Sequence, residues 1–97
     1  MKKLQIRKCE KIAEHYGKSS QETTAVSEII ELAQVLTRRL SQRGPNWREK
    51  LLDGLADATI VIQQLRLLYH VSDEDFEAKI EEKLDKQLEK IRDGNGA

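Results

Sequence analysis

The sequence predicts an all-α fold, because it has few breaks and its apolar residues recur at helical spacing. One proline and five glycines occur among 97 residues, so few positions interrupt a helix. Between Gly17, the pair Gly44-Pro45 and residues 70–72, apolar residues recur every three or four positions and do not alternate. We therefore expect four helices, at about 4–16, 20–42, 47–69 and 73–91. They form a single domain over residues 1–92, followed by a frayed tail at 93–97.

The predicted helices differ in how much of their surface is apolar. The first has one apolar side, made of Leu4, Ile6, Cys9, Ile12 and Ala13. The second and third are apolar around much of their circumference, so each must contact more than one neighbour. The last is amphipathic, with one stripe made of Phe76, Ile80, Leu84, Leu88 and Ile91. One small domain cannot cover this much apolar surface, so we expect the bundle to be completed by homo-oligomerisation, as a homodimer or homotetramer.

Capping-box patterns follow the breaks and set the expected helix starts. In this pattern a side-chain oxygen accepts from an early backbone N–H, and an acid three residues later reaches back. The pairs are Ser19 with Glu22, Asn46 with Glu49, and Ser72 with Asp75.

Composition excludes several classes of function. The 17 basic residues balance 17 acidic residues, so the basic excess that is typical of a nucleic-acid-polymer binder is absent. Cys9 is the single cysteine, which excludes an internal disulfide and a cysteine-rich zinc site. The start of the chain does not resemble a signal sequence, and the apolar run at 55–68 is too short and too polar to span a bilayer. We expect a cytoplasmic protein with no membrane partner.

Acidic residues within apolar runs are the main functional signal. Glu28 and Glu31 lie three positions apart in AVSEIIELAQVL, so both carboxylates fall on one face of a helix. Asp57 lies within LADATIVI, with Asp53 one turn earlier on the same side. If these two helices pack antiparallel, the two acidic strips face each other. Buried carboxylates that lie close together cost several kcal/mol each unless something compensates their charge.

Two kinds of compensation fit these acids. A hard divalent cation such as Mg²⁺ takes carboxylate oxygens and keeps positions open for a phosphate. Alternatively, the acids lie at the edge of the apolar face and pair with solvent or with Arg38, Arg39 or Lys50. The spacing alone leaves both open. The arginines around the predicted turn, Arg38, Arg39, Arg43 and Arg48, are likewise either phosphate-attracting or ordinary solubilising residues. Trp47 at a helix start more often anchors packing than stacks on a base.

Two long segments, IAEHYGKSSQETTAVSEIIELAQVLTR and LADATIVIQQLRLLYHVSDEDFEAKIEEKLDKQLEKI, resemble the MazG-like nucleotide pyrophosphohydrolases. The resemblance is strongest to the small single-domain members found in phages and prophages, and it covers nearly the whole chain. It implies a four-helix MazG-like bundle that binds Mg²⁺ and hydrolyses nucleoside triphosphates to a monophosphate and pyrophosphate. Glu28 and Glu31 match the family's ExxE pair, and Asp57 matches the last acid of its ExxD pair. These three residues are the implied catalytic and metal-binding set.

The chain departs from the family pattern at Gly54, where the first acid of the ExxD pair would fall. Asp53 is adjacent, but a shift of one residue turns a side chain by roughly 100° around a helix. Asp53 is therefore a fourth metal ligand only if the helix rotates or bulges. Glycine inside a helix also costs about 1 kcal/mol relative to alanine, with no packing return visible in the sequence. The departure leaves two expectations, a weakened three-carboxylate enzyme or an inactive relative that binds a nucleotide or a protein.

The resemblance also implies substrate contacts on the last helix. Lys79, Lys83 and Lys86 match a region that supplies basic contacts to the phosphates in relatives. Without the resemblance, these lysines read as a solvated face interleaved with glutamates.

Overall fold

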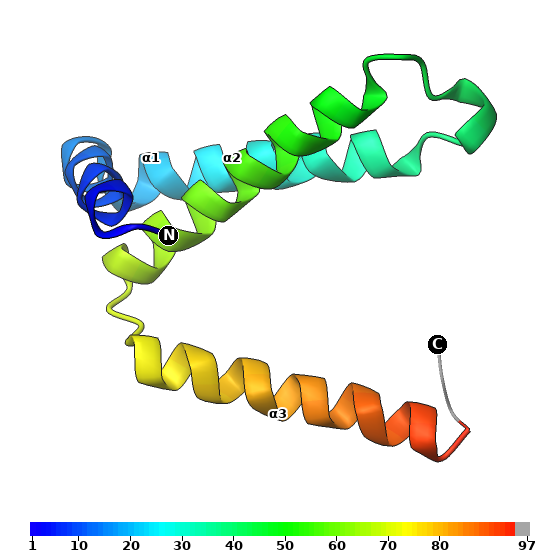
Figure 1. Ribbon diagram of the computed structural model, residues 1–97. Coiled ribbons are helices and arrows are strands. Elements are labelled where there is room, and N and C mark those ends of the chain that lie inside the picture. Colours follow the sequence, from blue (N-terminus) through cyan, green and yellow to red (C-terminus); the bar gives the residue numbers. More distant parts are fainter. Residues whose placement is uncertain (95–97) are drawn as a thin grey trace.

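The computed structural model describes residues 1–94, except for the side chain of Leu40, and over this range it consists of helices and turns. Three α-helices follow one another: α1 (Lys3–Thr37), α2 (Trp47–Leu68) and α3 (Asp73–Arg92). A short 3-10 helix, Leu40–Gln42, lies between α1 and α2 (Figure 1). The all-α prediction is confirmed, but there are three helices and not four.

Gly17 bends α1 without ending it. Its φ of +79° and ψ of 174° are not helical, and glycine adopts this backbone region without the clash that a Cβ would cause. Helix resumes directly after Gly17, so the two helices predicted on either side are arms of one bent helix (Figure 1). The capping box predicted at Ser19 is therefore wrong. The Ser19 carbonyl instead accepts from the Thr23 hydroxyl at 3.1 Å.

The long arm of α1 ends at Thr37, earlier than predicted, and side chains satisfy its last carbonyls. Arg38 is extended, and the Arg43 guanidinium donates to the carbonyls of Arg38 at 3.0 Å and Leu36 at 3.4 Å. These carbonyls lack partners within the helix, so Arg43 closes its C-terminal end. Asn46 occupies the predicted N-cap position of α2, but its side chain makes no capping hydrogen bond.

The long arm of α1 and α2 pack antiparallel as a helical hairpin (Figure 1). Small residues let the helices approach, and the buried apolar residues are Cys9, Ala13, Ala25, Ala58 and Val61. Trp47 locks the turn end, because its Nε1 donates to the Val35 carbonyl at 2.8 Å. At the other end the Tyr69 hydroxyl donates to the Glu22 carboxylate. The interior is thin, since no large side chain is fully buried among the described residues.

Helix α3 stands away from the hairpin. Ser72 Oγ accepts from the Asp75 backbone N–H at 3.1 Å, which confirms the predicted cap. Within residues 1–94, however, α3 makes no helix-to-helix packing with α1 or α2, and the ribbon shows it diverging from them (Figure 1). The predicted four-helix bundle is therefore not formed within one chain. Of the amphipathic stripe predicted on this helix, Ile80, Leu84, Leu88 and Ile91 are exposed.

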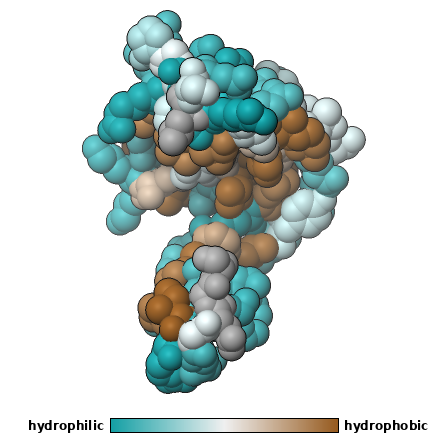
Figure 2. All heavy atoms as spheres, turned by 90° about the vertical axis from the view of Figure 1, so that its right-hand side faces the viewer, coloured by the Kyte–Doolittle hydropathy of each residue, from teal (hydrophilic) through white to brown (hydrophobic). Residues whose placement is uncertain are grey.

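The chain is expanded for its size. Its Cα radius of gyration is 16.4 Å, whereas a compact chain of this length has about 12.5 Å. It exposes 8086 Å², against about 5,700 Å² for a typical folded monomer of its mass. Figure 2 shows hydrophobic side chains exposed both on the hairpin and on α3. The expected homo-oligomer stays a prediction. The physical reason to expect it is this surplus of exposed surface.

The remaining expectations concern the membrane and the tail. None of the helices within the described part of the chain is both long and apolar enough to cross a membrane. Of the predicted frayed tail, Asp93 and Gly94 form a turn after α3, and residues 95–97 lie outside the described range.

Candidate functional site

Two grooves run along one side of the hairpin and meet at Asp57. The bend-side groove, of about 450 Å³, lies near the Gly17 bend and contains Glu28 and Asp57. The turn-side groove, of about 510 Å³, lies toward the α1–α2 turn and contains Glu31, Asp53 and Asp57. Since Asp57 lines both, the acids of the two strips expected from the sequence line two adjoining grooves of the hairpin.

The carboxylates of Glu28, Glu31 and Asp57 are neighbours. Partial burial raises the pKa of Glu28 above its ordinary value, and the negative charges of Asp57 and Glu31 raise this pKa further. A raised acid pKa is the expected response when like charges share a poorly solvated position. The hairpin therefore concentrates negative charge at the boundary of the two grooves.

No basic side chain neutralises these acids among the described residues. The ion pairs in this part of the chain involve Arg66, Lys79, Lys86 and Arg92, and none includes an acid of the grooves. Glu31, Asp53 and Asp57 are exposed, and Glu28 is half-buried. The acids thus lie at the edge of the apolar face, as the solvated alternative expects, but without the arginine or lysine pairs that it also allows.

Gly54 has a packing role that the sequence does not reveal. A Cβ at Gly54 would lie 3.1 Å from Leu32 Cδ1 and 3.6 Å from Leu32 Cα. A contact of 3.1 Å is tighter than carbon atoms normally accept. The packing return that is not visible in the sequence is therefore the close approach of α2 to α1 at this position.

Asp53 lines the turn-side groove although α2 contains no bulge. The helix runs regularly from Trp47 to Leu68, so Asp53 stays one turn from Asp57 on the same strip. It shares that groove with Glu31 and Asp57. Asp53 is thus placed beside the acidic cluster without moving into the position of Gly54.

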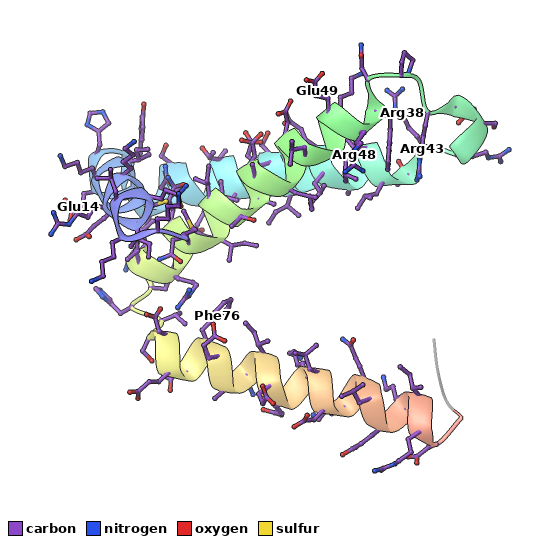
Figure 3. The ribbon with its side chains drawn as sticks, in the orientation of Figure 1. Glu14, Arg38, Arg43, Arg48, Glu49 and Phe76 are labelled. Carbon is purple, nitrogen blue, oxygen red and sulfur yellow. The ribbon has the colours of Figure 1, made fainter. Side chains whose placement is uncertain are left out.

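Arg38 and Lys50 bring positive charge to the turn-side groove. Both line it together with Glu31 and Asp57, and Figure 3 shows Arg38 at the turn end of the hairpin. Neither forms an ion pair within the described residues. A sequence signal for this placement exists, since Arg38 follows Glu31 by seven residues and Lys50 precedes Asp57 by seven. Two helical turns return a side chain to nearly the same face.

The other arginines of the turn have separate roles. The Arg43 guanidinium stacks over the Trp47 ring at 3.9 Å, in addition to binding the end of α1. Arg48 lies beside Leu51 and Leu52, outside the acidic grooves. The four-arginine cluster seen in the sequence therefore divides, and only Arg38 of its members lines the turn-side groove.

The lysines of α3 are not brought to the grooves within one chain. Lys79 and Lys86 pair with Glu82 at 2.9 and 3.4 Å, on an exposed face. The hydrogen bond from Lys79, followed by its charge and the contacts of Lys86, lowers the pKa of Glu82. Lys83 is also exposed, and α3 does not pack on the hairpin.

The donor chemistry of the cluster suits a hard divalent cation, because it consists of carboxylate oxygens whose negative charge is uncompensated. Within residues 1–94, no three acidic, histidine or cysteine side chains converge on one metal position. Binding by Glu28, Glu31 and Asp57 together would thus require these flexible side chains to turn toward a common point.

Comparison of the chain with protein-family models, with curated proteins and with solved structures finds no match. Membership of the MazG-like family stays a prediction that rests on the residues quoted above.

Proposed function

We propose that the protein is a Mg²⁺-dependent nucleoside triphosphate pyrophosphohydrolase. The observation that carries this proposal is the proximity of three carboxylates, Glu28, Glu31 and Asp57, from two helices, with no basic partner among the described residues. Such a cluster is unfavourable unless a cation joins it. Its position on an open groove leaves space for a substrate beside the cation.

The charges along the turn-side groove fit a metal-bound polyphosphate. Glu31, Asp53 and Asp57 line this groove, and so do Arg38 and Lys50, which form no ion pair with any residue that the structure describes. Guanidinium and ammonium groups are standard phosphate ligands. We assign Arg38 and Lys50 to the phosphates, and Lys79, Lys83 and Lys86 remain candidates only if another copy of the chain supplies them.

In the proposed reaction, water attacks the α-phosphorus and the bond to the bridging oxygen breaks. The products are a nucleoside monophosphate and pyrophosphate. Glu28, Glu31 and Asp57, with Asp53 beside them, would hold the cation. When bound, Mg²⁺ supplies charge neutralisation at the phosphates and favours hydroxide formation. A carboxylate of the cluster orients the attacking water, and Arg38 and Lys50 hold the departing pyrophosphate.

Pyrophosphate release from ribo- and deoxyribonucleoside triphosphates, with and without Mg²⁺, tests the activity. Asp57→Ala should lower turnover roughly 100-fold or more, since even outer-shell changes at metal sites cost 10- to 100-fold. Glu49→Gln is the matched control, because Glu49 is an exposed acid of α2 outside both grooves. Equal turnover in Asp57→Ala and the wild type would contradict the proposal.

Cation binding is tested separately by thermal unfolding. Mg²⁺ or Mn²⁺ should raise the melting temperature of the wild type, because a ligand that binds only the folded state stabilises it. The rise should be smaller in Glu31→Gln and unchanged in Glu49→Gln.

A second candidate is an inactive family member that binds a nucleotide or a protein through the same groove. The packing of Gly54 on Leu32 favours it, because the position of the missing acid is committed to the helix crossing. This candidate predicts a cation-dependent rise in melting temperature with no turnover for any nucleotide. A plain helical oligomerisation module, the third class, predicts neither.

A further inference from the structure

Within residues 1–94, no other helix covers the amphipathic stripe of α3. Ile80, Leu84, Leu88 and Ile91 recur at helical spacing, so they lie on one side of α3. Their exposed fractions rise along the helix, from 37% at Ile80 to 68% at Ile91. A stripe of this length on a water-facing helix is strongly unfavourable without a covering surface.

The hairpin carries a matching apolar groove. It lies between the short arm of α1 and α2, has a volume of about 500 Å³, and is lined mainly by apolar side chains. These include Met1, Cys9, Ile12, Leu52, Leu55 and Ile60. Leu52 is 65% exposed and Leu55 is 48% exposed, so this groove too is uncovered.

The α2–α3 turn holds α3 away from its own hairpin. The Arg66 guanidinium pairs with Asp73 at 2.6 Å and lies 4.0 Å from the centre of the Phe76 ring. His70 has a φ of +53°, and the Val71 N–H donates to the Arg66 carbonyl at 2.9 Å. Figure 3 shows Phe76 on the first turn of α3. These contacts fix the direction in which α3 leaves α2.

The excess surface matches what a stable dimer buries. Each chain exposes about 2,400 Å² more than a typical monomer of its mass. Two chains that lose this surplus bury about 4,800 Å² in total, which lies within the range of obligate homodimers. An extended terminal helix that exchanges between two identical chains is a common way to reach such a dimer.

We propose that two copies of this chain form a reciprocal dimer, in which the α3 stripe of each copy packs into the apolar groove of its partner. The partner surface is the hairpin groove defined above. Leu55 is two residues from Asp57, which places it about 200° around α2. The apolar groove nevertheless borders the bend-side groove, with which it shares Ile12 and Ile60. The proposal does not depend on catalysis.

Sedimentation equilibrium and light scattering test the dimer. The wild type should have twice the chain mass of 11.2 kDa. Leu84→Asp should halve the measured mass, because it puts a charge in the centre of the stripe. Ala78→Asp is the matched control, since it adds the same charge to the opposite side of α3, and it should leave the dimer intact. A monomeric wild type, or dimers that survive Leu84→Asp, would overturn the proposal.

Mixing two variants tests the exchange itself. Leu55→Asp spoils the groove but keeps the α3 stripe, and Leu84→Asp spoils the stripe but keeps the groove. Each should be monomeric alone. Their mixture should form heterodimers held by the one intact pair of surfaces, with a gain of helical signal in circular dichroism if either variant is partly unfolded. If the wild type is dimeric and the mixture forms no dimer, the exchange is wrong.

Discussion

At the scale of single residues, the acidic cluster centres on Glu28. Two other acids set its environment: one lies a single helical turn away, and the other is distant in sequence. Glu31 lies on its own helix, and Asp57 comes from α2. Burial, Asp57 and Glu31 all raise the Glu28 pKa. The pKa of Glu28 therefore depends directly on whether the hairpin brings the acids together.

The first prediction concerns Glu28→Gln. A carboxyl group whose pKa is raised by folding contributes stability that is complete below its ordinary value of 4.5. This contribution is lost as the pH rises through the raised pKa. Without divalent cations, Glu28→Gln should thus melt at a higher temperature than the wild type at pH 7, and the difference should vanish toward pH 4. Glu14→Gln, on an exposed part of α1, should show no such pH dependence. Equal melting of Glu28→Gln and wild type at pH 7 would contradict the clustering.

The second prediction concerns Gly54. Gly54→Glu should lower the free energy of unfolding by about 1–3 kcal/mol, which is the usual cost of overpacking a site. The reason is that the added Cβ contacts Leu32 too closely. Urea unfolding of the double variant Gly54→Glu/Leu32→Ala should show non-additivity, since removing the Leu32 side chain relieves the contact. Simple additivity would contradict the close approach. Gly54→Glu would thus complete the acidic set, but it would also disturb the packing of the two helices.

At the scale of elements, the bend in α1 creates the functional surfaces. The long arm supplies Glu28 and Glu31, whereas the short arm supplies Ile12 and Cys9 to the apolar groove. A straight α1 would carry the short arm away from α2. The bend at Gly17 is what folds it across.

The third prediction therefore concerns Gly17. Gly17→Ala should destabilise the protein by about 1–3 kcal/mol, because residues with a Cβ are strongly disfavoured at this combination of positive φ and extended ψ. No atom lies within 4 Å of the added Cβ, so the effect isolates backbone strain. Gly44→Ala is the control, since Gly44 also has open space around it and has no positive φ. Comparable unfolding free energies for the two variants would argue against the bend.

At the scale of the whole molecule, the dominant feature is the imbalance between apolar surface and available cover. Among the residues whose burial the structure describes, only five apolar ones are buried, while apolar side chains of α3 and of the hairpin are exposed. Figure 2 shows hydrophobic side chains exposed on both parts of the molecule. We therefore expect a chain with so thin an interior to gain much of its stability from the proposed association.

The fourth prediction follows from this dependence. The melting temperature of the wild type should rise with protein concentration, because unfolding is coupled to dissociation. The melting temperature of Leu84→Asp should be lower and independent of concentration. Differential scanning calorimetry over a wide concentration range measures both. A wild-type melting temperature that does not vary with concentration would contradict an obligate dimer.

The sequence by itself determined the helical class, the irregular backbone at Gly17, the cap at Ser72 and the placement of the acids on two helical faces. These features depend on local periodicity and on residue-specific backbone preferences, which act over a few neighbouring residues. The seven-residue spacing that puts Arg38 and Lys50 on the acidic strips is also present in the sequence. The same spacing is equally consistent with ion pairs and with a solubilising role.

Only the tertiary structure decided how these elements meet. The close approach at Gly54 depends on Leu32, 22 positions earlier in the chain, so no local pattern reveals it. The direction of α3 depends on Arg66, Asp73 and Phe76 at the α2–α3 turn. Because α3 points away from the hairpin, the expected four-helix bundle does not form among the described residues of one chain. Periodicity states which side of a helix seeks cover. Which surface provides that cover is decided by long-range packing, because apolar attraction is not directional.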